Sequence, residues 1–152
     1  MRLLHTMIVM FVASFITQYF LMGSIMTNSL ADVTNSIGKV YISVIMALYM
    51  VAFEVMMHDH QYSVLSTRTY VGIFGFLALF VFLYRRQIGI NDKQYLEGMI
   101  EHHSMALLTS NRILEKTSNY NVAKLAKNIL QKQEDEILEM RSVLHKLANA
   151  RS

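Results

Sequence analysis

The strongest constraint on this chain is apolar sequence that begins almost at its first residue. Between Leu3 and Ala31 there is no aspartate, glutamate, lysine or arginine. One helical crossing of a bilayer needs about 20 apolar residues, and the segment 3–26 is long enough. Two further apolar segments follow at about 37–57 and 69–84. The segment 69–84 has tyrosine and arginine at its ends, which are typical residues at membrane–water boundaries. We therefore predict three transmembrane helices.

Composition divides the chain into two parts. Charged residues make up only 16% of it, against about 25% in an ordinary soluble domain, and most of them lie in residues 85–152. We expect a membrane anchor over residues 1–86 and a soluble domain over 87–152. The first apolar segment is too long for a cleaved signal peptide, so we expect it to be retained. No basic run with interleaved aromatics occurs, so the expected partner is the lipid bilayer and not nucleic acid.

The soluble part has the pattern of two helices. Asn91, with Gln94 three residues later, has the form of an N-terminal cap, and the first helix is expected at about 92–116. A polar turn follows, and the second helix is expected at about 122–148. A connection this short makes the two helices antiparallel. The predicted fold is all-α, with three transmembrane helices followed by a helical hairpin.

A histidine interrupts the apolar face of the first hairpin helix. At 100° per residue His103 falls on the same face as Met99 and Ile100, and in the second helix Gln133 interrupts the apolar face while Glu136 borders it. Antiparallel pairing about the turn places His103 near Gln133. An unpaired buried imidazole costs about 1–3 kcal/mol, so the side chain of Gln133 or of Glu136 would accept its N–H. The second ring nitrogen would then be free for a metal. The alternative is a closed His–Gln hydrogen bond without metal.

The donor types around this histidine favour one kind of metal. Met99, His103 and Met140 combine thioethers with an imidazole, and the chain has no cysteine. Such a soft set suits Cu(I) best. His102 and Met105 point away from His103, and we expect any ligand of theirs to bind elsewhere, at a surface shared with a second subunit. No Glu-x-x-His pair occurs, so a di-iron centre is not expected.

A second polar group stands at the end of the second apolar segment, in "FEVMMHDH". Ionisable residues in a membrane span are functional candidates by default, which makes Glu54, His58 and His60 secondary candidates for a metal or proton role. The competing interpretation is that they simply reach the water at the headgroups.

The sequences "YLEGMIEHHSMALLTSNRI" and "LAKNILQKQEDEILEMRSVL" together resemble the DUF305 family, a ferritin-like domain of unknown function. The resemblance covers about residues 91–147. It implies a half-bundle of helices, a membrane-bound protein whose soluble domain faces the periplasm, and copper binding. The matching positions are Met99, Ile100, His102, His103, Ala106, Gln133, Glu136, Ile137 and Met140. The chain departs from the family pattern at Glu101, where many members have proline, and at Leu108 and Thr109, where many have a further methionine.

These observations lead to one expectation and one alternative. The expected function is Cu(I) sequestration, storage or delivery by an integral membrane protein that is not an enzyme, forms homo-oligomers and works with other copper-handling proteins. The candidate ligands are His103, His102, Met99, Met105 and Met140. Gln133 and Glu136 are the candidates for hydrogen bonds that orient these ligands. The alternative is an oligomerisation module without metal. The resemblance places the soluble domain outside the cytoplasm, whereas the count of flanking basic residues leans slightly the other way.

Overall fold

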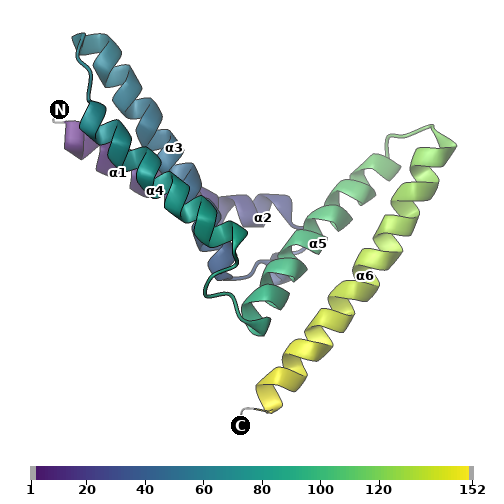
Figure 1. Ribbon diagram of the computed structural model, residues 1–152. Coiled ribbons are helices and arrows are strands. Elements are labelled where there is room, and N and C mark those ends of the chain that lie inside the picture. Colours follow the sequence, from purple (N-terminus) through teal and green to yellow (C-terminus); the bar gives the residue numbers. More distant parts are fainter. Residues whose placement is uncertain (1–2, 151–152) are drawn as a thin grey trace. The chain divides into compact units, whose positions relative to one another are not determined.

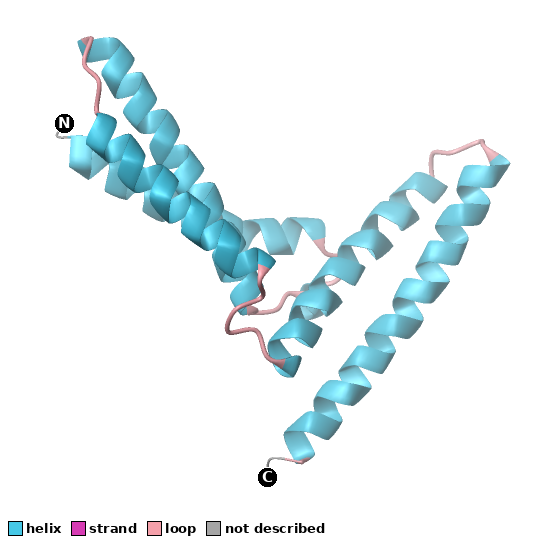
Figure 2. Ribbon diagram, in the orientation of Figure 1, coloured by secondary structure: helices cyan, strands magenta, loops and turns pink. Residues whose placement is uncertain are grey.

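The computed structural model describes residues 3–150, and every regular element in that range is helical, which confirms the all-α prediction. Figure 1 labels the helices and Figure 2 shows the loops that join them. The elements are α1 (Leu3–Ile16), a π-helical stretch η1 (Thr17–Met22), α2 (Gly23–Met26), a 3₁₀ turn η2 (Leu30–Asp32), α3 (Ile37–Tyr62), α4 (Thr67–Arg85), α5 (Asp92–Leu114) and α6 (Tyr120–Asn149).

The chain forms two compact units, and each is built from more than one stretch of sequence. The first contains residues 1–21 and 37–89, and the second contains residues 22–36 and 90–152. The sequence analysis divided the chain once, near residue 86. The structure instead adds the connection between the first two apolar helices, Met22–Ser36, to the unit that holds the hairpin.

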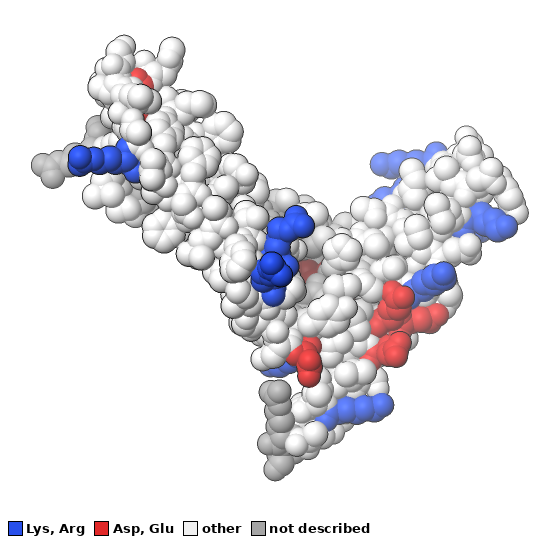
Figure 3. All heavy atoms as spheres, in the orientation of Figure 1, with Lys and Arg blue, Asp and Glu red and all other residues white. Residues whose placement is uncertain are grey.

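The first unit has α3 at its centre, with α1 and α4 packed against it. Its buried core consists of Val51, Val55 and Ile73. Three helical stretches are long and apolar enough to cross a membrane, namely Leu3–Met26, Ile37–Tyr62 and Thr67–Arg85. Charged side chains are sparse over them in the space-filling view (Figure 3). A membrane location is therefore possible for this unit.

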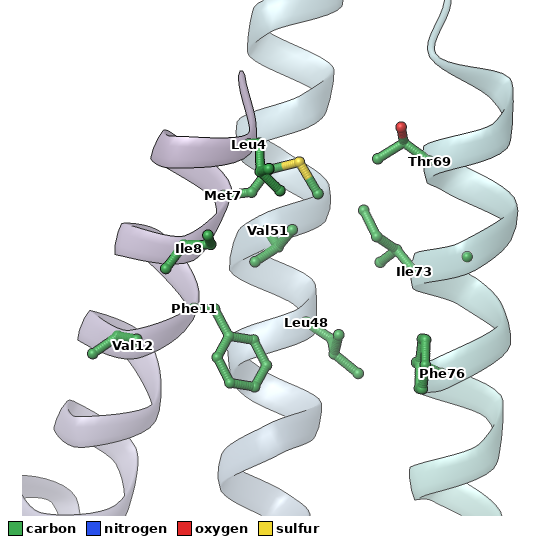
Figure 4. Close-up of a pocket in the computed structure, with 11 residues that line it drawn as sticks. Leu4, Met7, Ile8, Phe11, Val12, Leu48, Val51, Thr69, Ile73 and Phe76 are labelled. Atoms are coloured by element: carbon green, nitrogen blue, oxygen red, sulfur yellow. The ribbon is translucent and has the colours of Figure 1, made fainter. Parts of the chain in front are cut away.

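A shallow groove of about 360 Å³ opens over α3 between α1 and α4. Figure 4 shows its walls, with Phe11 from α1 on one side and Phe76 from α4 on the other, and Leu48 and Val51 on its floor. The hydroxyl of Thr69 is the polar group on a lining that is otherwise apolar. A surface of this kind suits contact with hydrocarbon and not with water.

The second unit contains the antiparallel hairpin of α5 and α6 (Figure 1). Asn91 caps α5 by accepting the N–H of Gln94 at 3.0 Å, and Asn119 caps α6 in the same way. Both helices therefore begin where a capping side chain satisfies their first amides. The core between them is small: Ile100, Leu107 and Ile137 are buried, and Leu130, Met140 and Leu144 pack around these three.

Candidate metal site

His103 lies on the face of α5 that packs against α6, with 13% of its side chain exposed. Its Nδ1 is buried and has no hydrogen-bond partner. Oε2 of Glu136, on α6, is 3.2 Å from this nitrogen. The two groups are thus within ion-pair distance, but their relative orientation does not make a hydrogen bond. A hydrogen bond depends on direction as well as distance, so the short separation does not pair this nitrogen.

Burial lowers the pKa of His103, and the charge of His102 lowers it further, whereas the carboxylate of Glu136 acts in the opposite direction. The burial effect is the largest of the three. The imidazole is therefore neutral around pH 7, which is the form that binds metals.

The contact between His103 and Glu136 differs from the expected pairing of His103 with Gln133. Side chains in an α-helix lean toward the N-terminus of their own helix. This lean carries the imidazole toward the level of Ile100, which shares a buried cluster with Ile137. Residue 136 is next to that level on α6, so Glu136 and not Gln133 meets the ring.

The two methionine candidates lie on the same side of this contact. Met99 is one helical turn before His103, and Met140 is one turn after Glu136. Because the helices are antiparallel, both steps go in the same direction along the hairpin. Both methionines are partly buried, and Met140 packs against the core cluster. One end of the site thus combines two thioethers with an imidazole.

The other two candidates from α5 are placed differently. His102 is exposed, and its ring centroid is 6.0 Å from that of His103 with 60° between the ring planes. Met105 is partly buried and lies one turn after Glu101, on the side of α5 that turns away from α6. Neither residue shares the face occupied by His103 and Met99.

The polar group at the end of α3 has a visible structural use. Asp59 is buried and accepts both the backbone N–H of Ser66 at 2.6 Å and its hydroxyl at 2.7 Å, which fixes the loop before α4. Nδ1 of His58 is 3.3 Å from the same carboxylate. His60 is exposed and Glu54 is partly buried. In the described part of the chain, no three residues among histidine, cysteine, aspartate and glutamate are grouped closely enough to hold a metal.

Sequence reasoning missed the second buried face of α5. Glu101, which the sequence marked as a departure from the family pattern, is only 6% exposed, and Ser104 is fully buried. Both are covered by the connection Met22–Ser36. The carboxylate of Glu101 accepts the N–H of Thr34 at 2.9 Å and its hydroxyl at 3.1 Å. The sequence offered one signal, the spacing of three residues between Glu101 and Ser104 in an amphipathic helix. This signal is too weak to identify the segment that covers them.

Comparison with known proteins gives two matches. The sequence model of the family described as "Domain of unknown function (DUF305)" matches residues 86–151. The uncharacterized protein L153 of Acanthamoeba polyphaga mimivirus is 32% identical over 137 residues, which cover 90% of each chain. That likeness therefore includes the apolar helices as well as the hairpin. No solved structure matches.

Proposed function

We propose a function for this chain from its own residues. The chain belongs to the DUF305 family, and the description of that family gives no function. The proposed function is the binding of Cu(I) by an integral membrane protein, for sequestration, storage or delivery to another copper-handling protein. His103, Met99 and Met140 would hold the ion. The observation that carries this proposal is the buried Nδ1 of His103, which lacks a hydrogen bond beside Glu136.

The donor set supports copper over other metals. A buried polar atom without a partner costs about 1–3 kcal/mol, and a site that retains such an atom has a reason for it. Thioethers and a neutral imidazole are soft donors that select Cu(I). When bound, the ion would supply the missing partner for the ring. The ion would take Nδ1, the nitrogen without a hydrogen bond, and the neutral ring would then carry its proton on Nε2, with the carboxylate of Glu136 beside the ion.

The membrane arrangement follows from the three helices. With α1, α3 and α4 as spans, residues 22–36 and the hairpin lie at the same membrane face, because two crossings separate them. Their common packing in one unit supports this arrangement. We place that face outside the cytoplasm, as the resemblance to membrane-bound family members implies.

The arrangement can be tested because the chain has no cysteine. Leu30→Cys and Ser118→Cys, which replace exposed residues, should react with a membrane-impermeant maleimide on intact cells. Val64→Cys should react only after permeabilisation. The opposite pattern would place the hairpin in the cytoplasm, and equal labelling of all three variants would contradict three spans.

A second function is favoured by the small core of the hairpin. The buried apolar cluster between α5 and α6 has three members, while Leu125 and Leu138 on α6 are more than 60% exposed. Two helices with so little core are expected to need further packing. The hairpin would then be an oligomerisation module, with His103 as an interface residue and no metal.

One experiment separates the two functions. Full-length protein in detergent is titrated with Cu(I) in competition with a chromogenic chelator, beside the double variant His103→Ala/Met99→Ala. The control is His145→Ala, which removes an exposed histidine near the end of α6. We expect the double variant to bind at least about tenfold more weakly, which corresponds to about 1.4 kcal/mol, and the control to match the wild type. Equal uptake by wild type and double variant would refute the copper site. A change of oligomeric state in His103→Leu, independent of copper, would then favour the oligomerisation module.

A further inference from the structure

Asp32 is a buried carboxylate that contacts both helices of the hairpin, although it lies in neither. It is 5% exposed. On α5 the hydroxyl of Ser104 donates to its Oδ2 at 2.6 Å, and on α6 the guanidinium of Arg141 donates to its Oδ1. One side chain from the connection Met22–Ser36 therefore bridges the two helices.

The connection holds Asp32 firmly in this place. Ser29 accepts the N–H of Ala31 at 3.2 Å and caps the 3₁₀ turn that carries Asp32. The N–H of Asn28 lies 3.0 Å from the hydroxyl oxygen of Ser104 and 3.2 Å from its carbonyl oxygen. Asp32 and Ser104 are thus joined both directly and through the backbone before the turn.

The bridge ends beside the candidate ligands. Ser104 follows His103 directly, and Arg141 follows Met140. We propose that Asp32 is a positioning residue that fixes the register of α5 against α6 at which His103 and Met99 lie together with Glu136 and Met140. Its importance for the site rests on the proposed copper function, whereas its effect on the register does not.

The apolar core alone sets this register weakly. Apolar side chains that recur every three or four residues also find partners when one helix slides by a turn. A polar contact does not tolerate that slide, because its groups would lose each other, and single buried polar residues fix register in coiled coils for this reason. Asp32 adds such a contact to a hairpin with three buried apolar residues.

The register can be measured by disulfide cross-linking, since the chain has no cysteine. Ser110 on α5 and Ala126 on α6 are small and buried. Counting along the antiparallel helices from Ile100 and Ile137, which share a buried cluster, puts them at about one level of the hairpin. A disulfide needs α-carbons about 4.4–6.8 Å apart, so Ser110→Cys/Ala126→Cys reports the register of the structure. Ser110→Cys/Ala123→Cys reports a slide of one turn.

We expect Asp32→Asn in the full-length protein to lower the yield of the first pair and raise that of the second, each at least threefold. Arg141→Gln should act in the same direction, and because Arg141 is half exposed this variant keeps the test valid if Asp32→Asn does not fold. Arg141→Lys should preserve the wild-type yields. Glu115→Gln, which removes an exposed charge paired with Arg112, is the control. Yields unchanged in both Asp32→Asn and Arg141→Gln would overturn the proposal.

Copper binding then separates the two proposals. In the cysteine-free background, Asp32→Asn should weaken Cu(I) binding about tenfold while the helix content by circular dichroism stays the same. A shift in cross-linking without any copper binding by the wild type would refute the copper function and keep the register role. Copper binding by the wild type with no effect of Asp32→Asn on either readout would refute the register role alone.

Discussion

Replacing Glu101 should loosen the connection Met22–Ser36 from α5. The carboxylate is buried and accepts the amide N–H of Thr34, and it shares the Thr34 hydroxyl proton with the carbonyl oxygen of Glu97. Hydrogen bonds to charged groups contribute about 1.5–3 kcal/mol each, and the two on one residue are not additive. Glu101→Ala also leaves the Thr34 amide without this acceptor. We expect the local opening of the connection to become easier by about 2–4 kcal/mol, and by about 1–2 kcal/mol in Glu101→Gln, which keeps one acceptor oxygen.

Hydrogen exchange of the full-length protein in detergent measures this opening. The reporter is the amide of Asn28, which is bonded to Ser104 and lies six residues before Thr34. A change of 2–4 kcal/mol corresponds to exchange faster by about 30-fold to about 1000-fold. Glu115→Ala removes an exposed carboxylate from the same helix and should change exchange by less than about 0.5 kcal/mol. Unchanged exchange at Asn28 in Glu101→Ala would refute the view that this carboxylate anchors the connection.

Three further outcomes follow from the packing and the charges. The lowered pKa of His103 means that the folded protein favours the neutral ring, so this stabilisation is present above the unfolded pKa of about 6.5 and is lost as pH falls through the lower folded value. Glu136→Gln should lower the pKa of His103 further in an NMR titration, because the carboxylate raises it. A rise would contradict this charge effect. Leu107→Ala should destabilise the hairpin by about 2–4 kcal/mol because it empties a buried site, whereas Leu138→Ala, at an exposed position, should stay within about 0.5 kcal/mol in chemical unfolding. Asp59→Ala should increase hydrogen exchange at the start of α4 by an amount equivalent to about 1–2 kcal/mol, as for the loss of a helix cap, and equal exchange would show that its two hydrogen bonds contribute nothing.

The helices themselves could be predicted from local sequence. Apolar runs predicted the three long helices, and the spacing of apolar residues, the cap at Asn91 and the polar turn before the second helix predicted the hairpin. The ends differ by a few residues, since the second hairpin helix begins at Tyr120 and not at 122. Periodicity succeeds for the hairpin because α5 and α6 each turn an apolar face toward the other.

The second face of α5 could not be predicted in this way. Glu101 and Ser104 are polar, and a polar residue off the apolar stripe normally faces water. Their burial depends on residues about 70 positions earlier, in a connection without regular periodicity. Spacing likewise left Gln133 and Glu136 as alternative partners of His103, because the direction in which a side chain leans is not visible in residue spacing.

These contacts show that the domain with the hairpin also includes residues from the connection Met22–Ser36. The family match begins at residue 86, yet the carboxylate that bridges α5 and α6 comes from Asp32, and the partner of Glu101 comes from Thr34. The chain passes between the two units three times, after Leu21, Ser36 and Gly89. A fragment from residue 88 onward would keep the three-residue apolar core but lose both polar anchors. It should therefore retain helices while losing the fixed register, and the connection between the first two apolar helices is best regarded as a structural part of the candidate site.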